Sequence, residues 1–145
     1  MLEVKIFTLY PDLFPGPLEM GIYKKAKENK IWDLKVINIR DYTTDGRGSV
    51  DDTPFGGGSG MLLRPDVVAS ALDKNTKPGE KIVFLSPKGR KFDQREARSI
   101  SKVNKINILC GHFEGIDQRL LETRNIEEYS LGDFILSGGE TASFV

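Results

Sequence analysis

The segment from Ile106 to Asp117, with the sequence INILCGHFEGID, constrains the fold of this 145-residue chain more than any other. An apolar run stops at Gly111, a short acidic and aromatic loop follows, and a helical pattern begins near Ile116. A short apolar run bounded by turn residues is typical of a buried strand. The segment therefore predicts a strand at 106–110, then a loop that could hold a ligand, then a helix.

Two further segments have the same character. FLSPKGR, from Phe84 to Arg90, follows an apolar run that starts at Lys81, and SLGDFILSGGE runs from Ser130 to Glu140. In open parallel sheets, ligands bind outside the carboxyl ends of the strands. We expect the three loops to lie at three neighbouring strand ends and to line one pocket.

The rest of the chain alternates between the two kinds of element. Period-two apolar patterns predict strands at 2–6 and 32–36, and the apolar run at 81–85 predicts another strand. Helical patterns predict helices at about 18–29, 65–74 and 94–102. A loop is expected at 86–93. Strands that alternate with helices indicate an α/β fold, with a parallel sheet flanked by helices on both faces. The length corresponds to a single domain.

A polar, glycine-rich connection runs from Arg40 to Met61. Loops of this length without their own secondary structure are usually functional or disordered, and flanking apolar residues favour function here. Its glycines are not followed by the Lys-Ser or Lys-Thr pair of a nucleotide triphosphatase. Gly111 and Gly115 also lack the spacing of a dinucleotide-binding loop.

The chain has 21 basic and 21 acidic residues, so nucleic-acid binding would need a local patch. One basic tract is a candidate, although a solvated helix face is a slightly better interpretation of it on sequence alone. The tract comprises Lys88, Arg90, Lys91, Arg95, Arg98, Lys102 and Lys105.

Cys110 and His112 are the only cysteine and the only histidine. They exclude an internal disulfide and a multi-histidine metal site, so no metal is expected. Cys110 is predicted to be a buried strand residue, whereas His112 either lines the pocket or is a loop residue without a catalytic role. The acidic residues Glu114, Asp117 and Asp133 would suit a cationic ligand.

Neither a signal peptide nor an apolar run near the ~20 residues of a membrane helix is present, so we expect a soluble cytoplasmic protein without a membrane partner. The residues from Gly138 to Val145 resemble the first turn of a helix that ends without a cap. We therefore expect that the chain is part of a longer protein.

The motifs at 84–94, 109–119 and 132–140 together closely resemble the bacterial tRNA (guanine-N(1))-methyltransferases of the TrmD type, which belong to the SPOUT class. FTLYP at 7–11 and PFGGGSGM at 54–61 also match, so the resemblance covers nearly the whole chain. The chain departs from the family at Phe84 and Phe113, where tyrosine is common, and at His112, where arginine is common. A further departure is Thr141-Ala142-Ser143 in place of Leu-Pro-Ala.

The resemblance implies a parallel sheet with a deep C-terminal trefoil knot, an exception to the general absence of knots. It also implies that S-adenosylmethionine binds in the knot, largely through backbone groups. The implied cofactor-binding residues are Leu85, Ser86, Pro87, Gly111, Phe113, Gly115, Ile116, Ser130, Leu131, Gly132, Asp133, Phe134, Ile135, Leu136, Gly138 and Gly139.

The implied reaction is methylation of N(1) of the guanosine at tRNA position 37, next to the anticodon. Glu114 would position the reacting groups, and the general base would lie beyond Val145. The implied RNA-contacting residues are Asp51, Gly56, Gly57, Gly58 and Gly60. Family members are homodimers with a C-terminal helical tRNA-binding domain, which would be absent from residues 1–145.

Two other functions remain open on the sequence. One is methylation of another RNA base by a different SPOUT enzyme, and the other is RNA binding without catalysis. Binding of RNA without binding of S-adenosylmethionine would distinguish a non-catalytic RNA-binding protein from both kinds of methyltransferase.

Overall fold

The structure is a computed structural model of the whole chain, and it describes residues 1–43, 49–52, 62–112 and 115–145. Five parallel strands form one sheet in the order β2-β1-β6-β5-β7. Their bounds are β1 Leu2–Thr8, β2 Trp32–Asn38, β5 Lys81–Lys91, β6 Lys105–Leu109 and β7 Glu127–Ser130. The predicted parallel α/β sheet is thus confirmed.

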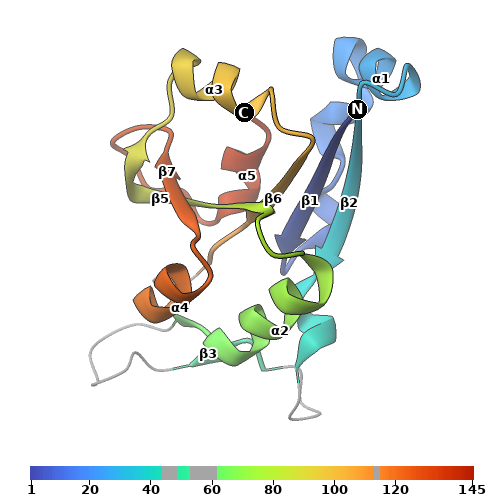
Figure 1. Cartoon of the computed structure of the whole chain (residues 1–145). Helices are drawn as coiled ribbons and strands as arrows, with labels where there is room; N and C mark the ends of the chain where they lie inside the picture. Colours follow the sequence, from blue (N-terminus) through green and yellow to red (C-terminus); the bar gives the residue numbers. More distant parts are fainter. Residues whose placement is uncertain (44–48, 53–61, 113–114) are drawn as a thin grey trace.

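Helices flank the sheet on both sides (Figure 1). The α-helices are α1 Gly21–Glu28, α2 Pro65–Asn75, α3 Gln94–Ile100, α4 Gln118–Thr123 and α5 Gly139–Ser143. Short 3-10 helices are η1 Pro11–Leu13, η2 Gly16–Glu19 and η3 Ile39–Tyr42, and a separate two-stranded ladder pairs β3 Asp51–Asp52 with β4 Leu62–Leu63. No helix within these described ranges is long and apolar enough to span a membrane.

Successive side chains along each strand point to opposite faces of the sheet, because side-chain direction in a strand repeats every two residues. Ile82 and Phe84 of β5 join a large core that includes residues of α2 and α4, whereas Val83 of the same strand joins a smaller cluster on the opposite face. Apolar contacts on both faces explain why residues 82–85 of β5 are all apolar.

The second face also carries an apolar groove of about 360 Å³. Val4 and Ile106 form part of its floor, and Phe144 and Val145 at the end of the chain lie along it. The last residues of the chain therefore lie on this face of the sheet.

Local sequence signals explain several boundaries. Pro65 begins α2, where its missing N–H is not needed. The Asp93 carboxylate accepts a hydrogen bond from the Glu96 N–H at 3.0 Å and so caps α3. Asp117 caps α4 in a similar way, by accepting from the Arg119 N–H at 2.9 Å.

Three predicted boundaries were wrong. The helix expected at 18–29 begins only at Gly21, whose positive φ of 61° separates it from η2. The helix expected near Ile116 begins at Gln118, because Ile116 instead bridges to Leu63 of β4. The third error concerns β5.

Strand β5 continues to Lys91, where a loop was predicted from Ser86 to Asp93. Tyr129 of β7 pairs with both Leu85 and Arg90, so the residues between them form an irregularity in the ladder. A Cβ at Gly89 would lie 2.6 Å from backbone atoms of Tyr129, so this position requires the close backbone approach that glycine allows. Such pairing with a distant strand leaves no local signal in the sequence.

Candidate functional site

A cavity of about 340 Å³ lies at the carboxyl ends of β5, β6 and β7. Its walls come from the three loops that the sequence analysis singled out, together with the start of α4. The predicted cofactor-binding residues that line it are Leu85, Ser86, Pro87, Gly111, Gly115, Ile116, Ser130, Leu131, Gly132, Phe134, Ile135, Leu136, Gly138 and Gly139. The expectation that three strand ends share one pocket is confirmed.

Other predicted site residues do not line this cavity or cannot be placed in it. Asp133 is exposed and is not part of the lining. Asp51 belongs to β3, whose partner Leu63 donates its N–H to the Gly115 carbonyl at 3.0 Å, so the ladder lies next to the cavity loop. The predicted residues Phe113, Glu114, Gly56, Gly57, Gly58 and Gly60 lie outside the described residues.

The segment from 133 to 137 runs along the cavity, and all of its residues except Asp133 line the cavity. In the described parts of the chain, no group forms a hydrogen bond with the backbone N–H or C=O of these five residues. The segment also exposes large apolar side chains, with Phe134 53%, Ile135 86% and Leu136 40% accessible. Backbone polar groups that are shielded from water require a partner, so a ligand that displaces water from this wall has to form hydrogen bonds with them. This wall can therefore bind a flat, neutral, hydrogen-bonding group between apolar side chains.

Two glycines allow the third loop to pack directly against the end of β6. The Gly139 N–H donates to the Gly111 carbonyl at 2.9 Å, and a Cβ at Gly139 would lie 2.8 Å from Cα of Cys110. A Cβ at Gly111 would lie 2.4 Å from the Phe84 ring. Side chains at these positions would therefore separate the cavity walls.

Glu140 is a buried carboxylate beside the cavity, with a relative exposure of 2%. One oxygen accepts a hydrogen bond from the Thr8 hydroxyl at 2.6 Å, and the other lies 2.6 Å from Nε2 of His112. The Tyr10 ring packs against the His112 imidazole with centroids 4.9 Å apart. Glu140 thus joins the end of β1, the loop after β6 and the start of α5.

This network was not predicted. His112 was left between two interpretations, and the structure places it in the cavity wall. Glu140 was treated as part of a glycine motif rather than as a buried acid. Its position directly after Gly138 and Gly139 was the available signal, but its partners come from residues 28 and 132 positions away in the sequence.

Cys110 is fully buried, as predicted. Burial, together with the nearby Glu140 carboxylate, raises the pKa of its thiol far above the ordinary value. The thiol therefore remains protonated at neutral pH and is a poor nucleophile.

The charges around the cavity differ from those expected. The Asp117 carboxylate is held by Arg119, at 2.8 Å, and this hydrogen bond lowers its pKa. Asp117 is not part of the lining, whereas Glu128 of β7 is. Of the acidic residues expected to attract a cation, none that the structure describes lines the cavity. Glu128 is instead the acidic residue that lines the cavity.

Tyr129 connects the cavity to an ion-pair cluster at the edge of the sheet. Its hydroxyl lies 2.9 Å from Glu127 and 3.0 Å from Glu96, and it also contacts the Arg90 guanidinium. Burial and these carboxylates raise the pKa of Tyr129 to about 12, against the opposing effect of Arg90. The hydroxyl therefore stays protonated, and the cluster holds α3 against β5 and β7.

We found no group of three or more potential metal ligands within the described ranges.

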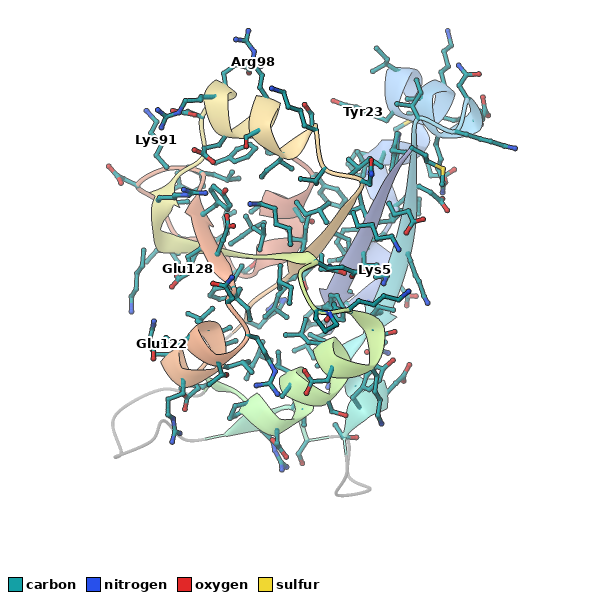
Figure 2. The ribbon with its side chains drawn as sticks, in the orientation of Figure 1. Lys5, Tyr23, Lys91, Arg98, Glu122 and Glu128 are labelled. Atoms are coloured by element: carbon teal, nitrogen blue, oxygen red, sulfur yellow. The ribbon has the colours of Figure 1, made fainter. Side chains whose placement is uncertain are left out.

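Replacing Glu140 with alanine should lower the free energy of unfolding by about 1.5–3 kcal/mol, because hydrogen bonds to charged groups contribute on this order. The change would leave Thr8 and His112 without their shared acceptor. Urea denaturation at neutral pH measures the effect. Glu122→Ala is the matched control, since Glu122 is exposed on α4 (Figure 2). Equal free energies of unfolding for the two variants would show that the hydrogen bonds of Glu140 contribute nothing to stability.

Comparison with known proteins assigns the chain to a family. A family model described as tRNA (Guanine-1)-methyltransferase TrmD matches residues 2–145. The chain belongs to the TrmD family. The match is consistent with the cavity, because the TrmD-type motifs supply its loops.

Several curated relatives carry the same name, tRNA (guanine-N(1)-)-methyltransferase. The protein from Pelagibacter ubique is 64% identical over 145 residues, which cover all of this chain and 64% of that protein. The protein from Bartonella tribocorum is 48% identical over 143 residues, covering 99% of this chain and 61% of the relative. The chain thus spans somewhat less than two thirds of the length of these TrmD relatives.

Proposed function

We propose that residues 1–145 form the cofactor-binding domain of a tRNA (guanine-N(1))-methyltransferase, and that the cavity binds S-adenosylmethionine. The observation that carries the proposal is the cavity itself. Three TrmD-type motifs, far apart in the sequence, supply its walls.

The chemistry of the cavity fits this cofactor. Adenine is flat and neutral, so the backbone groups at 134–137 can bind its edge while Leu136 and Ile116 contact its faces. The volume of about 340 Å³ falls within the usual range of about 300–1,000 Å³ for ligand sites. A cationic sulfonium gains from a nearby carboxylate, and Glu128 is a lining residue that can provide it.

The bound cofactor would supply an electrophilic methyl group. In the proposed reaction guanine N(1) would accept this methyl group as the carbon–sulfur bond broke, and the N(1) proton would pass to a base. Transfer requires nitrogen, carbon and sulfur in line, and the rigid wall formed by Gly111, Gly138 and Gly139 would hold one side of that alignment. We propose that Glu114 positions the reacting groups and that the base lies in a segment beyond Val145.

The TrmD resemblance supports further proposals on organisation. We propose a trefoil knot, supported by the return of the segment after β7 to the end of β6, where Gly139 bonds to Gly111. We propose that the active protein is a homodimer, as the TrmD resemblance implies, and that it has a separate helical tRNA-binding domain, which the greater length of the relatives supports. A cytoplasmic location follows from the proposed tRNA substrate.

The RNA side of the site is proposed to include Asp51 and the glycines at 56, 57, 58 and 60. The contact between β4 and Gly115 supports this proposal, because it brings the strands that flank residues 53–61 to the cavity loop.

Transfer of a labelled methyl group tests the proposal. A chain extended to the full length of the relatives should methylate a tRNA transcript with guanosine after the anticodon, and should not methylate the same transcript with adenosine there. Equal labelling of both transcripts would favour an enzyme for a different base. RNA binding without any labelling would favour a non-catalytic module.

A further inference from the structure

The positive charge of the chain is concentrated in one segment. Residues 88–105 contain seven lysine and arginine residues and only two acidic ones, Asp93 and Glu96, in a chain whose total charge is balanced. A local excess of positive charge creates a positive electrostatic potential at that part of the surface, even though the net charge of the chain is zero.

Two of the seven cations are occupied by partners within the fold. Arg90 contacts Glu127 at 3.1 Å and Glu96 at 3.3 Å. Lys105 contacts Glu3 at 3.3 Å. These two residues stabilise the edge of the sheet and are excluded from the surface considered below.

The remaining five are all exposed, and we refer to them as the basic strip: Lys88, Lys91, Arg95, Arg98 and Lys102. Within the part of the chain that the structure describes, the only acidic group within 4.0 Å of the strip is Glu96, 3.9 Å from Arg95. Lys91 and Arg98 extend from the same end of the molecule into solvent (Figure 2). The strip is therefore available to an anionic partner.

The fold places the strip along one path. Arg95 and Arg98 are three residues apart on α3 and so share one side of the helix. Lys102 follows in the next turn, and Lys91 precedes the helix at the end of β5. Lys88 lines the cavity itself. The strip thus begins at the cavity rim and continues over α3, the yellow helix at the upper left of Figure 1.

We propose that the basic strip binds the phosphate backbone of the RNA whose target base enters the cavity. The inference rests on the proposed function and adds a surface to it. When the target guanine lies beside the cofactor, the RNA backbone attached to it passes the cavity rim at Lys88. The phosphates of the neighbouring nucleotides then lie along α3. Arginine suits this contact because its guanidinium can bind phosphate through two parallel hydrogen bonds. Such contacts position the RNA without reading its sequence.

The test replaces Lys91, Arg95 and Arg98 together by glutamine and leaves Lys88 intact because it lines the cavity. The matched control replaces Lys24, Lys25 and Lys35 by glutamine. These exposed lysines lie on α1 and β2, at the opposite edge of the sheet from β7. Binding of an unmodified tRNA transcript is measured by fluorescence anisotropy from about 0.05 to 0.2 M salt, a range in which phosphate contacts dominate affinity.

We expect the strip variant to bind tRNA about 100-fold more weakly near 0.1 M salt, with a shallower salt dependence, since each phosphate contact contributes roughly 0.7 to the logarithmic slope for single strands. The control variant should match the parent. Calorimetry with S-adenosylmethionine is run in parallel, and the strip variant should keep the cofactor affinity of the parent. Circular dichroism verifies folding, and Arg98→Gln alone provides a milder variant.

Three results would overturn the inference. One is equal affinity and slope in the strip variant and its parent. Another is an absence of tRNA binding by a parent chain that binds cofactor, which would leave the cofactor proposal intact. The third is strip-dependent binding of polyglutamate but not tRNA, which would indicate an acidic protein partner. Conversely, strip-dependent tRNA binding without cofactor binding would support the strip and contradict the proposed methyltransferase site.

Discussion

Gly138→Val is expected to weaken S-adenosylmethionine binding by roughly 10- to 100-fold, since overpacking costs about 1–3 kcal/mol and each 1.4 kcal/mol is tenfold in affinity. A Cβ at Gly138 would lie 2.2 Å from the His112 ring and 2.7 Å from a Glu140 oxygen. Either the His112–Glu140 pair moves or the loop moves into the cavity. Both outcomes change the wall that the cofactor would contact, and calorimetry measures the loss.

Thr141→Val is the matched control, because it introduces the same side chain at an exposed position of α5 outside the cavity lining. Its affinity should equal that of the parent. If a folded Gly138→Val protein keeps full affinity, Gly138 only shapes a turn.

Gly111→Val should behave differently. Its Cβ would meet the Phe84 ring, which is only 5% exposed, so the substitution also strains the main core. We therefore expect a lower melting temperature as well as lost binding, and Gly138→Val is the cleaner probe of the cavity.

The second large effect concerns turnover. The 145-residue chain should transfer methyl groups to tRNA at least about 10²- to 10⁴-fold more slowly than a chain of the relatives' full length, because general-base catalysis contributes about this factor. The comparison uses labelled cofactor and a tRNA transcript with guanosine after the anticodon. Within residues 1–145 we propose Glu114 as the acid that could substitute for this base, although the TrmD resemblance assigns it a positioning role.

Equal rates in the two chains would place the base within residues 1–145. The proposed assignment of the base to a later segment would then be wrong, while the proposed cofactor site would stand.

The amino-acid sequence predicted the cavity better than it predicted the fold around it. Glycine-bounded loops after apolar runs are local features, so the pattern of residues alone predicted that the three loops share one pocket. The individual lining residues Gly111, Ser130 and Gly138 came from the TrmD resemblance. The alternation of strands and helices likewise predicted the parallel sheet, because apolar periodicity records burial directly.

The features that were missed depend on contacts between distant segments. The extension of β5 to Lys91 arises from pairing with β7, and the burial of Glu140 depends on Thr8 and His112. The acidic loops were interpreted as ligand-facing, yet Asp117 caps α4 instead. Capping aspartates and ligand-binding aspartates look alike in a sequence, and only the position of the following helix distinguishes them.

Calorimetric titration of this chain with S-adenosylmethionine and with its demethylated product tests the central claim most directly. Both should bind with one site per chain. Each should also raise the melting temperature, with about 2.7 kcal/mol of stabilisation at one hundred times the Kd. Gly138→Val should shift the titration to roughly 10- to 100-fold higher ligand concentrations and reduce the thermal shift, whereas Thr141→Val should match the parent. Neither heat nor a thermal shift at millimolar concentrations, with a parent chain that is folded by circular dichroism, would contradict the assignment of the cavity.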